Sequence, residues 1–134
     1  MTEMAPTHTA TCCCGQLRAT VEGPLPSASV CHCRQCQRRT GSVFGVQARF
    51  PKERVSIEGR STAFVRWGEG EVTLYFCPTC GSTVYWRLDG LPDSVIIAVG
   101  AFANADFPAP TFSVYEARQH PWVQLPDSVT THWD

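Results

Sequence analysis

The stretch Cys77-Pro78-Thr79-Cys80-Gly81 places a tight turn between two cysteines. Such a turn lets both thiolates point at one zinc ion at about 2.3 Å. We expect Gly81 to supply the positive φ that the turn often needs, and Thr79 and the N–H groups after it to hydrogen-bond the sulfurs. A closed structural zinc site is tetrahedral, so this turn requires two further ligands from elsewhere in the chain.

The stretch Cys12-Cys13-Cys14-Gly15 supplies a second pair of cysteines, again followed by a glycine. Side chains of adjacent residues on an extended chain point to opposite faces, so we interpret Cys13 as a free thiol that points away from its neighbours. The sequence therefore predicts one structural zinc with four ligands, Cys12, Cys14, Cys77 and Cys80.

A third cluster lies in the stretch Cys31-His32-Cys33-Arg34-Gln35-Cys36. Three thiols without an evident fourth ligand are typical of a catalytic zinc, which keeps one position open. The alternative is a second structural site, closed by a histidine or by Cys13. His32 stands between two of the thiols, so we expect its side chain to point away from the metal, either at the surface or behind the ligands.

Length and charge narrow the class of protein further. A chain of 134 residues has the size of one domain. Its net charge of −1 argues against a general nucleic-acid binder, and no apolar run approaches the roughly 20 residues of a membrane helix.

The N-terminus lacks the features of a secretory signal, so we expect the protein in the cytoplasm. Disulfides are rare there, so the eight cysteines favour metal binding. We expect a flexible leader over residues 1–8 and a single zinc-binding domain over 9–134.

Short alternating segments bounded by glycine and proline predict a mainly β fold. One short helix is expected over 33–40, ended by Gly41. Strands are expected at 16–22, 27–31, 43–50, 55–58, 63–67, 72–76, 84–88, 94–99 and 112–115.

With its three cysteine clusters in this order, the sequence resembles the glutathione-dependent formaldehyde-activating enzyme family, which includes centromere protein V. The stretches Thr40-Gly41-Ser42, Tyr85-Trp86 and Pro121-Trp122 strengthen the likeness, which covers roughly residues 10–127. The resemblance implies a zinc-stapled β-tent fold of short antiparallel sheets with one short helix. It also implies two zinc ions, a structural one on Cys12, Cys14, Cys77 and Cys80 and a catalytic one on Cys31, Cys33 and Cys36.

The activity that this resemblance implies is a carbon–sulfur lyase reaction in reverse, the joining of glutathione to formaldehyde to give S-hydroxymethylglutathione. A zinc ion held by three thiolates carries a negative formal charge and is a poor activator of water, but it still binds a thiol as the thiolate. The partner is then a small-molecule thiol such as glutathione. Arg38 and Arg39 follow the third cluster and are candidates to pair with the glutathione carboxylates, the alternative being a solvated helix end.

The competing hypothesis is a non-catalytic zinc module that binds a protein partner. It requires a middle cluster closed by a fourth protein ligand, with no cleft beside it. We further expect the three-thiol site to be the more fragile one, which is found empty or oxidised before the four-thiol site.

Overall fold

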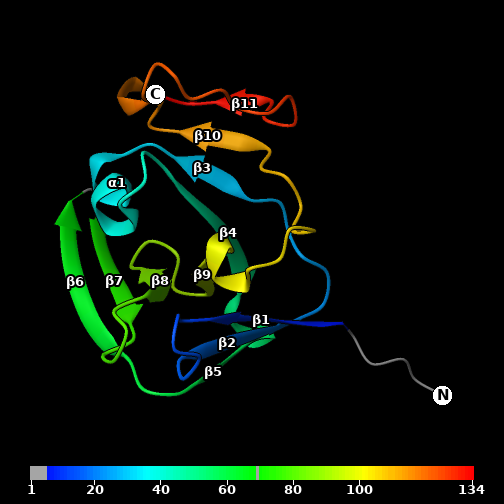
Figure 1. Ribbon diagram of the computed structural model, residues 1–134, viewed down its shortest axis with the longest axis vertical. Helices are drawn as coiled ribbons and strands as arrows, with labels where there is room; N and C mark the ends of the chain where they lie inside the picture. Colours follow the sequence, from blue (N-terminus) through cyan, green and yellow to red (C-terminus); the bar gives the residue numbers. More distant parts are fainter. Residues whose placement is uncertain (1–5, 69) are drawn as a thin grey trace.

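The computed structural model describes residues 6–68 and 70–134, and its chain forms two β-sheets and one α-helix (Figure 1). The strands are β1 (Thr7–Thr11), β2 (Arg18–Glu22), β3 (Ser29–Cys31), β4 (Gly45–Pro51), β5 (Val55–Glu58), β6 (Thr62–Gly68), β7 (Gly70–Phe76), β8 (Thr83–Leu88), β9 (Ser94–Ala98), β10 (Phe112–Val114) and β11 (Thr131–His132). The helical elements are α1 (Arg34–Thr40) and the 3-10 turns η1 (Lys52–Arg54), η2 (Val99–Phe102) and η3 (Glu116–Arg118). The predicted mainly β class with one short helix is confirmed.

The two sheets differ in size and in pairing. The smaller has the order β1-β2-β5, and the larger has the order β11-β10-β3-β4-β9-β8-β7-β6. In Figure 1 the smaller sheet crosses the bottom of the view, and the larger one extends from β11 at the top to β6 at the left margin. Most neighbours are antiparallel, as expected, but β10 runs parallel to both β3 and β11. These parallel pairs join segments that are distant in sequence, so no hairpin signal announces them.

The N-terminal strand corrects one boundary of the sequence analysis. β1 begins at Thr7 and pairs along its whole length with β2, so Thr7 and His8 do not belong to a flexible leader. Residues 1–5 of that predicted leader lie outside the described residues. A single domain over 9–134 stays a prediction.

The main core lies between the two sheets. In β2, Ala19 and Val21 are fully buried while their neighbours are not, which is the period of two expected for a strand with one covered face. β9 is buried on both faces: Ile97 joins the core between the sheets, and Ile96 packs on the opposite face with Leu74 and Trp86. Two cysteines, Cys12 and Cys77, also belong to the main core. Within the described residues, no helix has the length and apolar character needed to cross a membrane.

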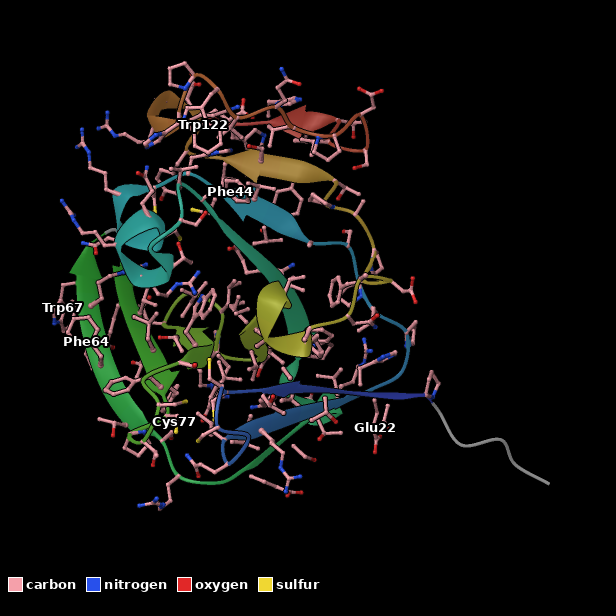
Figure 2. The ribbon with its side chains drawn as sticks, in the orientation of Figure 1. Glu22, Phe44, Phe64, Trp67, Cys77 and Trp122 are labelled. Carbon is pink, nitrogen blue, oxygen red and sulfur yellow. The ribbon has the colours of Figure 1, made fainter. Side chains whose placement is uncertain are left out.

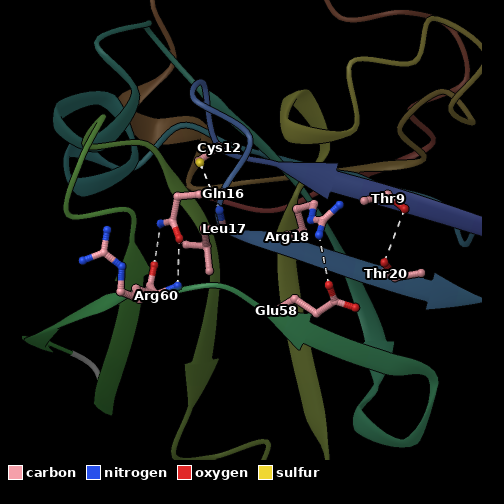
Figure 3. A network of polar contacts seen from close by, with 8 residues as sticks. All are labelled: Thr9, Cys12, Gln16, Leu17, Arg18, Thr20, Glu58 and Arg60. Atoms are coloured by element: carbon pink, nitrogen blue, oxygen red, sulfur yellow. Dashed lines mark hydrogen bonds and ion pairs between the residues drawn. The ribbon is translucent and has the colours of Figure 1, made fainter.

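The segment after β5 is fixed against the turn between β1 and β2 by the side chain of Gln16 (Figure 3). Gln16 Nε2 donates to the carbonyl of Arg60 at 2.8 Å, and Gln16 Oε1 accepts from the Arg60 N–H at 2.9 Å. The same Nε2 also donates to Cys77 Sγ at 3.0 Å. Beside this contact, Gly59 adopts a φ of +95°, and a Cβ there would lie 2.0 Å from the Gln16 carbonyl oxygen. Only glycine therefore fits at position 59.

We predict that Gly59→Ala lowers the free energy of unfolding by about 2 kcal/mol or more, because it adds both a backbone overlap and an unfavourable φ. Urea unfolding followed by circular dichroism measures this change. Gly90→Ala is the matched control, since a Cβ at position 90 meets nothing within 4 Å, and it should change stability by less than about 0.5 kcal/mol. Equal losses in the two variants would contradict the close approach.

Candidate metal centre and adjoining cavity

Two pairs of cysteines from distant turns meet at one point between the sheets. Cys12 and Cys14 follow β1, whereas Cys77 and Cys80 follow β7, and all four Sγ atoms lie within 4.8 Å of one another. The Sγ atoms of Cys14 and Cys77 are 3.7 Å apart although 63 positions separate these residues in the chain. Figure 2 shows Cys77 where the end of β7 approaches the smaller sheet. The four thiols predicted to form one cluster are brought together, and they can hold a metal ion.

The turn after β7 has the local structure that its sequence predicts. Gly81 has a φ of +81°, and its N–H donates to the carbonyl of Cys77 at 2.8 Å. The N–H of Thr79 donates to Cys77 Sγ at 3.4 Å. Hydrogen bonds to the backbone and hydroxyl of Ser82 lower the pKa of the Cys80 thiol to about 5. The turn therefore favours thiolates, which are the form that binds a metal ion.

Cys13 lies outside the four-thiol cluster, as its alternation with Cys12 and Cys14 predicts. Its side chain is exposed, and its Sγ accepts a hydrogen bond from the Ser82 hydroxyl at 3.0 Å. Its N–H donates to the same hydroxyl oxygen at 3.2 Å, so Cys13 braces the two turns without entering the cluster.

The second cluster forms where β3 passes into α1. Cys31 ends β3, Cys33 caps the N-terminus of α1, and Cys36 lies in its first turn, with the three Sγ atoms within 4.8 Å of one another. Cys31 and Cys36 are buried, whereas Cys33 is partly exposed. The neighbouring thiols of Cys31 and Cys36 lower the pKa of the Cys33 thiol to about 2, which favours its thiolate. Among the described residues, no fourth histidine, cysteine or carboxylate joins this cluster.

His32 is held behind these thiols by a buried hydrogen bond. It is fully buried rather than at the surface, and its Nε2 lies 2.9 Å from the hydroxyl of Ser113 in β10, which is also fully buried. Burial lowers the pKa of His32, which favours the neutral form of its ring. Burial alone would raise the pKa of Glu116, but hydrogen bonds from His132 and Ser113 lower it. Ser113 therefore interacts with both the buried ring of His32 and the carboxylate of Glu116.

A second contact ties the C-terminal segment to the three-thiol cluster. Gln37 Nε2 donates to the carbonyl of His32 at 2.9 Å, and Gln37 Oε1 lies 3.0 Å from Nε2 of His120. His32 is thus fixed through both its side chain and its carbonyl.

A cavity of about 290 Å³ lies near the three-thiol cluster: no cysteine lines it, but Arg39, which does, packs against Gly45 together with Cys36. Its lining residues come from α1, β6, β7 and β8 and are Gln35, Arg38, Arg39, Phe64, Arg66, Leu74, Phe76 and Thr83. This size is at the small end of ligand pockets, and the lining combines an apolar floor with three guanidinium groups. The positive charge of Arg66 favours the thiolate of Cys33, whereas the pKa of Cys36 is raised despite the charge of Arg39.

The side chain of Arg39 packs against the protein and is not a solvated helix end. Its guanidinium carbon lies 4.4 Å from the centre of the Trp86 ring. Its Nη2 packs over Gly45, where a Cβ would lie 2.7 Å away, and this buried nitrogen has no hydrogen-bond partner among the described residues. Arg38 is exposed at the rim of the same cavity.

Several residues of this region carry no signal in the sequence. Arg66 lies in β6, and the residues next to it in the sequence do not indicate that this face of the sheet meets α1. Ser113, Gln37 and His120 come from segments more than 80 positions apart, so no local spacing announces their contacts.

These features define a mainly β protein that can hold two metal ions, one in a complete set of thiols and one in an incomplete set beside an arginine-lined cavity. The family model of the glutathione-dependent formaldehyde-activating enzyme matches residues 7–118, and the chain belongs to this family. The match includes all seven cysteines of the two clusters.

The comparison with solved structures supports the fold. The crystal structure of a Rhodobacter sphaeroides protein superposes with a TM-score of 0.57 at 20% sequence identity, covering 94% of this chain and 99% of that one. The two chains therefore share their fold. The comparison with curated proteins gave no match.

We predict that Ser113→Ala destabilises the protein by about 1–3 kcal/mol, because it leaves the buried Nε2 of His32 without its hydrogen-bond partner. Chemical denaturation measures the loss. Ser128→Ala is the control, since the Ser128 hydroxyl donates to the Pro110 carbonyl at an exposed position and its removal should cost less. A Ser113 variant as stable as wild type would show that the His32 contact contributes nothing.

Proposed function

We propose that the protein joins a small anionic thiol, glutathione, to formaldehyde, which is a carbon–sulfur lyase reaction in the synthetic direction. The observation that carries this proposal is an incomplete three-thiol cluster at the start of α1, the helix that contributes two of the three arginines of a neighbouring cavity. Family membership supports the same activity. A reducing cytoplasm suits a protein that depends on seven free thiols.

Both clusters fit zinc by the chemistry of their donors, since cysteine thiolates are preferred zinc ligands. We assign the structural zinc to Cys12, Cys14, Cys77 and Cys80, and the catalytic zinc to Cys31, Cys33 and Cys36. When bound at the three-thiol cluster, zinc would hold the substrate sulfur as a thiolate. The greater fragility expected of this site stays a prediction.

The chain's own residues supply binding and orientation. Arg38, Arg39 and Arg66 offer bidentate partners for the carboxylates of the substrate, and the unpartnered Nη2 of Arg39 gives one of them a buried position. With its carboxylates held there, the substrate sulfur is directed toward Cys33, the partly exposed member of the cluster. In the reaction the sulfur forms a bond to the aldehyde carbon, and the thiol proton ends on the aldehyde oxygen. Positioning of this kind suffices for a reaction whose uncatalysed barrier is already low.

The alternative of a non-catalytic module that binds a protein partner has less support. It requires a fourth protein ligand at the middle cluster and no adjoining cleft. The described residues supply no such ligand, and a cavity lies beside the cluster.

We predict two zinc ions per chain in the wild-type protein and one in Cys33→Ser, with the rate above the uncatalysed reaction reduced by about 100-fold. Metal analysis together with a glutathione–formaldehyde assay measures both effects. Cys13→Ser is the control and should keep both metals and full activity, because Cys13 belongs to neither cluster. A folded Cys33→Ser protein with full activity would refute the catalytic assignment.

We predict that Arg38→Gln raises KM for glutathione by about fivefold and leaves kcat unchanged, because it removes a charged contact made equally in the ground state and the transition state. Arg34→Gln removes the same charge from an exposed position of α1 outside the cavity and should leave KM unchanged. Equal increases in the two variants would indicate a general charge effect instead of a carboxylate site.

A further inference from the structure

The outermost strand of the larger sheet is an unprotected edge. Among the described residues β6 pairs only with β7, in a regular register over seven residue pairs. Figure 2 shows Phe64 and Trp67 at this outer margin of the molecule, and their exposed fractions are 57% and 74%. Natural edge strands are usually protected by lysine, proline, a bulge or short length. β6 is seven residues long and has no lysine, proline or bulge; its one charged side chain, Arg66, lines the cavity, and β11 at the other end of the sheet has only two residues.

We propose that β6 pairs antiparallel with β6 of a second copy of this chain, about a two-fold axis at Val65. A two-fold axis perpendicular to the sheet leaves the two faces of the sheet unexchanged. Residues directly opposite each other must then share a face, so the axis lies between the two strands at the level of one residue, which faces its own copy. With the axis at Val65, the two Val65 side chains face each other, Phe64 faces Arg66, and Ala63 faces Trp67. The strand is thus complementary to itself.

Each of these cross-strand pairs is favourable. Phe64 opposite Arg66 allows a guanidinium–aromatic contact, and Ala63 opposite Trp67 leaves room for the large indole. Two β-branched valines pair well at the centre. Val65 is also the central residue of β6, so an axis there pairs all seven residues of the strand, whereas an axis at Phe64 or Arg66 leaves two of them without a partner. An axis at Arg66 would in addition set two guanidinium groups directly opposite each other, which is repulsive. Self-complementarity in one register therefore favours a second copy over an unrelated peptide as the occupant of this edge.

The pairing has a consequence for the cavity, although the proposal does not depend on the proposed enzymatic function. Phe64 and Arg66 lie on the face of β6 that lines the cavity. Residues that oppose each other across an antiparallel pair share a face, with Cβ atoms about 4.5–5.5 Å apart. Arg66 of the second copy would therefore lie beside Phe64 and add a guanidinium to the rim. The net charge of −1 per chain opposes association only weakly.

Sedimentation equilibrium tests the association directly. The apparent mass of the wild-type protein should rise with concentration and reach twice the 14.8 kDa mass of the chain by about 200 µM. Dissociation constants of weak protein interfaces lie in this micromolar range. Val65→Lys should weaken dimerisation at least tenfold, because it sets two ammonium groups across the axis. Ile57→Lys is the matched control, since it places the same charge at an exposed position on the edge strand of the smaller sheet and should leave the dimer intact.

A mixing experiment tests the register. Val65→Lys and Val65→Glu should each be monomeric alone and should form a heterodimer when mixed, because only a residue that faces its own copy gains an opposite charge in the mixture. Circular dichroism verifies that both variants are folded. A wild-type protein that is monomeric throughout, a Val65→Lys protein that dimerises like wild type, or a mixture that stays monomeric would each overturn the proposal.

Discussion

The fold depends on the convergence of four sulfurs from two distant turns. Cys12 and Cys77 are at once members of the four-thiol cluster and of the hydrophobic core between the sheets. The cluster therefore lies where the smaller sheet meets the larger one, and Gln16 joins it to the segment after β5. A chain of this size has limited core to hold two sheets together, and a metal-bound set of thiols adds binding free energy directly to folding.

The three-thiol cluster differs from the four-thiol cluster in where its cysteines come from. Its cysteines all come from one short stretch, so a local turn from β3 into α1 brings them together without a distant partner. Its surroundings are nevertheless assembled from far along the chain, since Ser113 and His120 fix the segment from behind and Arg66 acts from the front. A rigid support on one side and a cavity on the other is the arrangement that a reactive site needs.

The sequence predicted the parts of this protein that depend on local spacing. The strands β2 to β10, α1 and the grouping of seven cysteines into two clusters follow from alternation, from the cap at Gly41 and from the cysteine spacing. The strands β1 and β11, the parallel pairing of β10 and the role of Arg66 did not follow. Each of these depends on which face or edge a distant segment meets, and one strand's alternation does not carry that information.

The central claim is that the three-thiol cluster leaves one coordination position for the substrate sulfur. Zinc K-edge X-ray absorption of the fully loaded protein, with and without glutathione, tests it most directly. The account predicts that the mean number of sulfur ligands per zinc rises on adding glutathione, until both sites have the four ligands typical of zinc. A sulfur count already at four without glutathione, or a count that glutathione does not change, would contradict the account.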